Sequence, residues 1–145
     1  MIVLKLFIGC LRFYINIVMI IAQLSKFLKL LNESDNSILE IGQFSQISQY
    51  IRNGRVFVNK NIQIKCMKKH KIRNIKSFAT NTLNNLQFIT PYPNDSRVLN
   101  FYASFRNTVG KIKYQMVAIS KSDGMVVTAM VVSPTAYQRA MPNAI

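Results

Sequence analysis

The only histidine of the chain, His70, lies in a run of basic side chains, and no acidic residue occurs between Glu40 and Asp95. An imidazole titrates near neutral pH, which makes it the side chain best suited to moving protons there. Clustered ammonium and guanidinium groups bind polyphosphates through counterion release. The run consists of Lys65, Lys68, Lys69, Lys71, Arg73 and Lys76. This combination predicts nucleic-acid binding, with a histidine placed to act on the bound strand. A solvent-exposed helix face gives a similar run, and the run alone does not separate the two interpretations.

The positive charge is unevenly distributed along the 145 residues. The formal net charge of the chain is +14, of which residues 1–54 contribute +2 and residues 55–145 contribute +12. The second part is therefore expected to bind an anionic partner, either a nucleic acid or an acidic protein.

Five acidic residues in the whole chain exclude several kinds of active site. A glycosidase needs two facing carboxylates, and a two-metal nuclease needs a cluster of acidic ligands. Cys66 and His70 have a helical spacing, but Cys10 lies far away in an apolar segment, which leaves too few ligands for zinc. We expect no metal and no cofactor. Two unpatterned cysteines also favour a reducing, cytoplasmic compartment.

Cleavage of RNA without a metal requires a base, an acid and groups that stabilise the crowded phosphorane. His70 is the candidate base or acid, and Arg73 is the candidate bidentate phosphate ligand. Thr128 and Tyr114 are candidate hydroxyl donors on strands, although Thr is also an ordinary strand residue and Tyr commonly packs. The candidate RNA contacts are Lys68, Lys69, Lys71, Lys76, Lys111, Lys113 and Tyr102.

Residues 1–31 are predicted to form an N-terminal helical segment, separate from a domain over residues 32–145. The apolar segment is interrupted by Lys5, Arg12 and Asn16, and its most apolar run, Phe13 to Ala22, is shorter than the about 20 residues that cross a bilayer. Four interpretations are open: a membrane-associated helix, a signal peptide without a clear cleavage site, a helix that packs on the domain or a partner, and codons upstream of a start at Met19. The polar residues 32–36 predict a linker.

The first half of the domain is expected to be mainly helical. Ser37 and Glu40 have the spacing of a capping box, which predicts a helix that ends near Asn53. Short strands are predicted at residues 55–58 and 62–64, followed by a helix over residues 68–86.

The second half alternates polar and apolar residues with a period of two. A turn with two prolines is predicted at residues 90–95, followed by strands at residues 99–106, 111–120 and 125–132. The last of these is apolar on both faces and is expected to be central. The order predicts an α+β fold, with N-terminal helices followed by a helix packed on an antiparallel sheet of about four strands.

This order, with KKHK before a helix and VVTA at the end of a three-stranded meander, resembles the barnase–EndoU–colicin–RelE group of metal-independent ribonucleases, which includes phage-encoded and polymorphic-toxin members. The resemblance covers residues 62–132, about half of the chain. It implies RNA bound on an exposed sheet face. His70 with Lys71 or Arg73 would match the basic element of the group, and Thr128 the hydroxyl on a late strand. The chain departs from the better-known members in having a single histidine.

The resulting prediction is a toxin-like endoribonuclease that acts through a 2′,3′-cyclic phosphate in a bacterial or phage-infected cell, or is delivered to a target cell. Two alternatives belong to other classes: a non-catalytic basic module that binds RNA or DNA, and a protein whose residues 1–31 insert into a membrane while its basic face meets anionic lipid. A toxin of this charge is expected to have an acidic immunity or antitoxin protein as a partner.

Overall fold

The computed structural model describes the backbone of residues 2–145, together with all of their side chains except those of residues 2, 4, 27 and 29–36. The chain divides into two compact units, residues 1–36 and residues 37–145. The fold class is α+β, as predicted, with an antiparallel sheet of four strands in the second unit.

The first unit is a single helix, α1 (Ile2–Asn36). The prediction of a linker at residues 32–36 is wrong, because the helix continues to Asn36. Asn, Ser and Asp are only moderately poor helix formers, and the segment lacks the Pro or Gly that would end a helix. The part from Lys5 to Lys26 has 22 residues and a mean hydropathy of 1.8, so it is long and apolar enough to cross a membrane. An N-terminal signal sequence meets the same criterion.

The second unit begins with an antiparallel pair of strands, β1 (Ile38–Gln43) and β2 (Arg55–Asn59), joined through the 3₁₀ turns η1 (Ser45–Ile47) and η2 (Arg52–Gly54). The helix predicted to begin at Ser37 is therefore wrong. Glu40 does not cap a helix; its carboxylate accepts hydrogen bonds from Arg55 of β2 at 3.0 and 3.1 Å. The isoleucine spacing fits a helix equally well, and pairing with β2 decides the outcome.

Two helices follow β2, namely α2 (Lys60–His70) and α3 (Ile75–Asn84). The strand predicted at residues 62–64 is wrong, because the Asn59 side chain accepts a hydrogen bond from the Ile62 N–H at 2.8 Å and starts α2 there. The helix predicted over residues 68–86 is in fact the end of α2, a short connection and α3.

The sheet has the order β3-β4-β5-β6, with β3 (Leu86–Pro91), β4 (Val98–Arg106), β5 (Ile112–Ser120) and β6 (Val126–Val131). The strands predicted at residues 99–106, 111–120 and 125–132 are confirmed. The turn predicted at residues 90–95 is wrong at residues 90 and 91, which end β3, because an edge strand tolerates a proline. The prediction that β6 is central is wrong, since it is the other edge. Its apolar character has another cause: α2 packs beside it, and Cys66 of α2 is fully buried.

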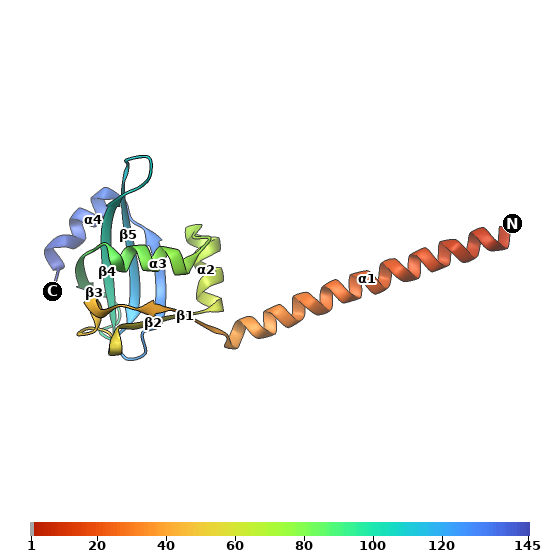
Figure 1. The fold of residues 1–145 in the computed structure, drawn as a ribbon, viewed down its shortest axis with the longest axis horizontal. Coiled ribbons are helices and arrows are strands. Elements are labelled where there is room, and N and C mark those ends of the chain that lie inside the picture. Colours follow the sequence, from red (N-terminus) through yellow and green to blue (C-terminus); the bar gives the residue numbers. More distant parts are fainter. Residues whose placement is uncertain (1) are drawn as a thin grey trace. The chain divides into compact units, whose positions relative to one another are not determined.

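The face of the sheet that carries Phe101 of β4 and Val117 of β5 packs against α3 and the β1–β2 pair (Figure 1). The α3 residues Ile75, Ala79 and Leu83 recur with helical spacing and are all buried in this core. We call this the helix-covered face.

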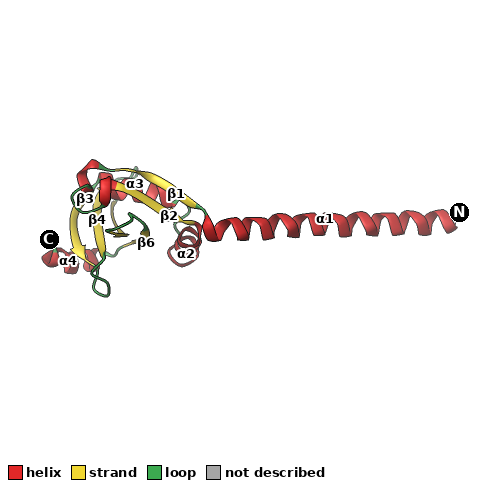
Figure 2. Ribbon diagram, turned by 90° about the horizontal axis from the view of Figure 1, so that it is seen from below, coloured by secondary structure: helices red, strands yellow, loops and turns green. Residues whose placement is uncertain are grey.

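The opposite face of the sheet carries α4 (Pro134–Ala140), which was not predicted (Figure 2). Ser133 caps this helix by accepting a hydrogen bond from the Ala136 N–H at 3.1 Å. Tyr137 is 4% exposed, and its ring centroid lies 5.0 Å from that of Phe88 and 4.5 Å from that of Tyr114. We call this side the α4 face.

A close backbone contact joins β2 to the turn before β6. The N–H of Phe57 donates to the carbonyl of Gly124 at 2.9 Å. Gly124 has a φ of +71°, and a Cβ at this position would collide with the carbonyl oxygen of Arg55. Only glycine tolerates both the positive φ and the close approach of the Arg55 carbonyl oxygen, so this residue allows the β1–β2 pair to be held against the sheet.

Candidate functional site

The connection between α2 and α3 is the most basic part of the second unit, and hydrogen bonds define where α2 ends and α3 begins. His70 is the last residue of α2, and Lys71 follows in the left-handed conformation with φ 55° and ψ 32°. The Ile72 N–H then donates back to the Cys66 carbonyl at 3.2 Å, which ends the helix. Ile72 is buried, so the neighbouring side chains of Lys71 and Arg73 are held on the surface.

The start of α3 adds neutral donors next to these cations. The Asn74 side chain accepts a hydrogen bond from the Ser77 N–H at 3.1 Å and caps the helix. Both residues line a hollow with a volume of about 360 Å³, which we call the basic hollow. Its wall is formed by His70, Lys71, Ile72, Arg73, Asn74, Ser77, Phe78, Asn81, Lys113, Gln115 and Val131.

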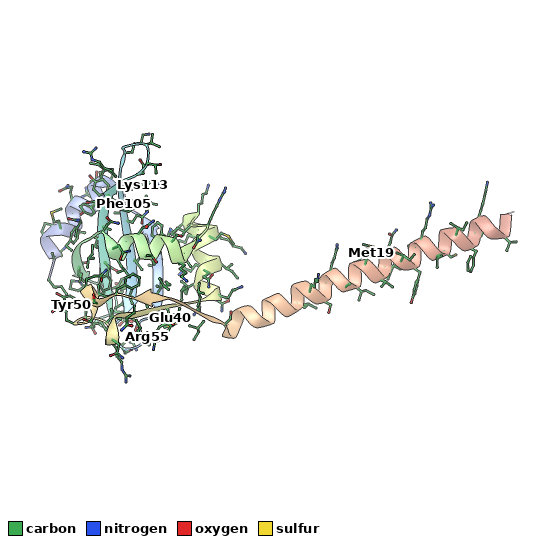
Figure 3. The ribbon with its side chains drawn as sticks, viewed as in Figure 1. Met19, Glu40, Tyr50, Arg55, Phe105 and Lys113 are labelled. Carbon is green, nitrogen blue, oxygen red and sulfur yellow. The ribbon has the colours of Figure 1, made fainter. Side chains whose placement is uncertain are left out.

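Two residues of β5 reach the basic hollow from the helix-covered face. Lys113 is exposed near the β4–β5 hairpin, beside its cross-strand neighbour Phe105 (Figure 3). Gln115 is 6% exposed, and its Oε1 accepts a hydrogen bond from the Thr82 hydroxyl of α3 at 3.0 Å. The same hydroxyl also lies 2.8 Å from the Phe78 carbonyl oxygen, so its single hydrogen is shared between two acceptors. None of the residues that line this hollow is acidic.

The single imidazole of the chain is held in its neutral form at this site. Burial, and next the positive charges of Lys69 and Lys65, lower the pKa of His70 from its usual 6.5. At neutral pH the ring is therefore uncharged and has a lone pair available for a proton. A neutral imidazole among cations is an arrangement that acid–base catalysis on a phosphodiester can use.

The structure brings together only some of the predicted site residues. His70, Arg73, Lys71 and Lys113 line the basic hollow. Lys68, Lys69 and Lys76 are exposed on α2 and α3, and Lys111 is exposed just before β5.

The predicted convergence of His70 with Tyr114 and Thr128 is wrong. Lys113 and Gln115 line the hollow, whereas Tyr114 points to the opposite, α4 face and contacts Tyr137 there. Alternate residues of a strand point to opposite faces, so one strand cannot supply both to one pocket. Thr128 does not line the hollow either.

Thr128 and Tyr102 have structural contacts instead. Burial raises the pKa of the Cys66 thiol, and a hydrogen bond with Thr128 is among the smaller opposing effects, so Thr128 helps to seat α2 against β6. The Tyr102 ring stacks on Phe88, with centroids 4.8 Å apart and an interplanar angle of 15°. One face of the Tyr102 ring is thus covered by Phe88, and its contact with RNA stays a prediction.

Sequence reasoning missed the neutral donors of the hollow. Asn74 and Ser77 have the spacing of a helix cap, which was a detectable signal inside the longer predicted helix. Gln115 gave no such signal, because only its buried bond with Thr82 distinguishes it from a surface glutamine.

Comparison of the chain with protein-family models, with curated proteins and with solved structures finds no match. The resemblance to the barnase–EndoU–colicin–RelE group therefore stays a prediction from short motifs.

Proposed function

We propose that residues 37–145 form an RNA-binding domain that contacts the sugar–phosphate backbone at the basic hollow. The observation that carries the proposal is that Lys71, Arg73 and Lys113, from two separate elements, line one hollow without an acidic neighbour in its wall. Arg and Lys supply the main phosphate contacts in nucleic-acid complexes, and Ser and Asn side chains add neutral ones.

The charge balance of the domain supports this partner. Residues 37–145 hold fifteen Lys and Arg against three acids, Glu40, Asp95 and Asp123. Glu40 is paired with Arg55, and Asp95 with Arg97, at 3.0 and 3.1 Å. Among the described residues, the cations that line the basic hollow form no ion pair, and their field is directed to solvent.

The test is a salt titration of binding between the full-length chain in detergent and a fluorescent single-stranded RNA. Each lost phosphate contact should reduce the slope of log K against log salt by about 0.7. Arg73→Ala and Lys113→Ala are expected to weaken binding and to lower this slope. Lys121→Ala, which removes an exposed cation outside the hollow, is the matched control. An equal loss in all three variants would contradict a site at the hollow.

A second candidate function, metal-independent RNA cleavage, is favoured by the position of His70 in the wall of the basic hollow, beside Lys71 and Arg73. The neutral imidazole would take the proton from the ribose 2′-hydroxyl, whose oxygen then attacks phosphorus. The bond to the 5′ oxygen breaks, and an ammonium group of the hollow protonates that leaving oxygen. The products are a 2′,3′-cyclic phosphate and a 5′-hydroxyl, and Arg73 would stabilise the added charge of the phosphorane.

Cleavage has its own test. The full-length chain is incubated with RNA in EDTA, and the product ends are identified by mass spectrometry. His70→Ala should stop cleavage and preserve most of the binding, and RNA with 2′-deoxyribose at the cut should resist. Absence of products from the wild type would reject cleavage and leave RNA binding intact. An active enzyme would need an inhibitor in the producing cell, and an acidic protein fits this surface.

We also propose that α1 tethers the domain to a membrane. Its 22-residue segment from Lys5 to Lys26 is about 33 Å long at 1.5 Å per residue, close to the about 30 Å of a bilayer core. Lys5 and Lys26 at its ends would reach the headgroups, and Arg12 would extend its long side chain toward the nearer surface.

A further inference from the structure

A second hollow lies on the α4 face, away from the cations of the basic hollow. Its volume is about 550 Å³, within the range of small-ligand pockets. The residues that line it come from β3, β4, α4 and the 3₁₀ turn η3 (Met141–Asn143). They are Thr90, Pro91, Pro93, Asn100, Tyr102, Arg139, Ala140 and Asn143.

The inner wall of this hollow is polar and buried, which is unusual for the middle of a sheet face. Thr90 is 4% exposed and Asn100 is 5% exposed, and the two are cross-strand neighbours on β3 and β4. The Oδ1 atom of Asn100 is buried without a hydrogen-bond partner. A buried acceptor without a donor costs about 1–3 kcal/mol, so a ligand that supplies an N–H or O–H would recover this free energy.

The outer wall is held in place at both ends. Tyr137 anchors α4 through its ring contacts with Phe88 and Tyr114. The N–H of the last residue, Ile145, donates to the Ile89 carbonyl of β3 at 2.9 Å, which closes η3 against the edge of the sheet. The hollow is therefore a preformed feature of the domain.

We propose that this second hollow binds one nucleotide. Asn100 Oδ1 would accept a hydrogen bond from a base N–H, and Arg139 at the rim would bind the phosphate. The Pro91 and Pro93 rings offer apolar surface to the flat base, while the Tyr102 ring is already occupied by Phe88. No acidic residue lines the hollow, so an anion meets no repulsion from its wall.

Burial raises the pKa of the Tyr102 hydroxyl, an effect that its hydrogen bonding with Thr90 and Asn100 only partly offsets. This group therefore stays protonated and neutral. The orphan acceptor of Asn100 is the group left for the ligand. The same chemistry is offered by a free mononucleotide and by one nucleotide of an RNA strand.

The experiment uses the full-length chain in detergent and the four ribonucleoside 5′-monophosphates with their four nucleosides, measured by calorimetry. At least one monophosphate should bind saturably at millimolar concentration. Arg139→Gln should weaken that monophosphate about tenfold and leave its nucleoside unaffected, because only the phosphate contact is lost. Lys121→Gln, the control cation, should change neither affinity.

Asn100→Leu should abolish binding of both the nucleotide and the nucleoside, because the acceptor for the base N–H is removed. Arg139 is exposed, so Arg139→Gln tests the proposal even if the Asn100 variant fails to fold. The proposal is overturned if none of the four monophosphates binds, or if Arg139→Gln and Lys121→Gln have equal effects.

A short RNA of the preferred base identifies the source of the nucleotide. If Arg139→Gln also weakens this RNA, the hollow takes a residue of the strand; if it does not, the ligand is a free nucleotide. Arg73→Ala should weaken RNA and leave the monophosphate unaffected. Failure of RNA binding at the basic hollow would therefore be seen separately from failure of the nucleotide site.

Discussion

The side chains of Thr82 and Gln115 are joined by a hydrogen bond of 3.0 Å, with the Thr82 hydroxyl donating to Oε1 beneath the basic hollow. Both residues are at least nine-tenths buried. The bond ties α3 to β5 where the helix-covered core meets the polar wall of the basic hollow. A buried pair of this kind stabilises the fold only while both partners are present.

Thr82→Val should therefore destabilise the protein by about 1–3 kcal/mol, because it leaves the Gln115 oxygen buried without a donor. Chemical unfolding measures the change. The double variant Thr82→Val with Gln115→Met should be more stable than Thr82→Val alone, since both polar partners are then removed. Simple addition of the two single effects would contradict the coupling.

The titration of His70 can be followed without assignment, because the chain has one histidine. The imidazole C–H signals in NMR should titrate with a midpoint below 6.5, since burial and the charges of Lys69 and Lys65 lower the pKa. Lys69→Gln should raise the midpoint, and bound RNA should raise it further. A midpoint unaffected by RNA would place the bound phosphates away from this ring.

The lowered pKa of His70 also makes the free energy of unfolding depend on pH. The unfolded chain binds this proton more tightly than the folded protein, so the contribution of His70 is complete above pH 6.5 and is lost as the pH falls toward the lowered pKa. His70→Gln should flatten this part of the curve of unfolding free energy against pH. The rate of RNA cleavage should decline over the same pH interval, because the imidazole base becomes protonated.

Lys71→Gly should separate stability from binding. Lys71 has a φ of 55°, which costs a non-glycine residue about 1 kcal/mol, and glycine adopts this conformation freely. We expect a more stable protein in thermal unfolding and weaker RNA binding. Lys71→Ala is the control, which should weaken RNA binding to the same extent as Lys71→Gly without a gain in stability. A destabilised Lys71→Gly variant would show that the side chain has a structural contact.

Gly124→Ala should destabilise the domain strongly, and Gly110→Ala only by the cost of its conformation, about 1–3 kcal/mol. Both glycines have positive φ, but a Cβ at Gly110 meets no atom within 4 Å, whereas at Gly124 it meets the Arg55 carbonyl oxygen. The difference between the two unfolding free energies measures how firmly β2 is held to the turn before β6. Equal effects would contradict a rigid contact there.

Binding of α1 to lipid should be hydrophobic in origin. The full-length chain is expected to sediment with both neutral and anionic vesicles and to stay bound in high salt. Ile17→Lys with Ile20→Lys should release it, because two charges then fall within the apolar segment. Gln49→Lys with Ser96→Lys, which adds the same two charges at exposed positions of the second unit, is the control pair. Release of the wild type by salt would instead indicate attraction by the basic domain alone.

β4 and β5 were predictable because each alternates polar and apolar residues, and β6 was predictable as an apolar run after the turn at residues 122–124. The first half of the domain was not predictable, because Ile38, Ile41, Ile47 and Ile51 satisfy a helical spacing as well as a strand followed by tight turns. Pairing with β2, about 15 residues further along the chain, decides between them.

The basic residues of the candidate site were predictable from the sequence, whereas the strand residues that accompany them were not. The sequence places Lys113 and Tyr114 on opposite faces of β5, but it does not say over which face the α2–α3 connection lies. The structure puts that connection on the side of Lys113 and Gln115, and α4, whose position the sequence did not indicate, takes the side of Tyr114. Strand periodicity fixes the two faces, and only tertiary packing assigns them their neighbours.

The two cysteines differ in exposure, so one of them can be labelled selectively. Cys10 in α1 is exposed, whereas Cys66 is buried and its thiol pKa is raised, so a maleimide reagent at neutral pH should modify Cys10 alone. An environment-sensitive dye can thus be attached to the wild-type chain at the N-terminal helix. Its emission would report transfer of that helix from water to lipid while the folded unit and both of its hollows stay chemically untouched.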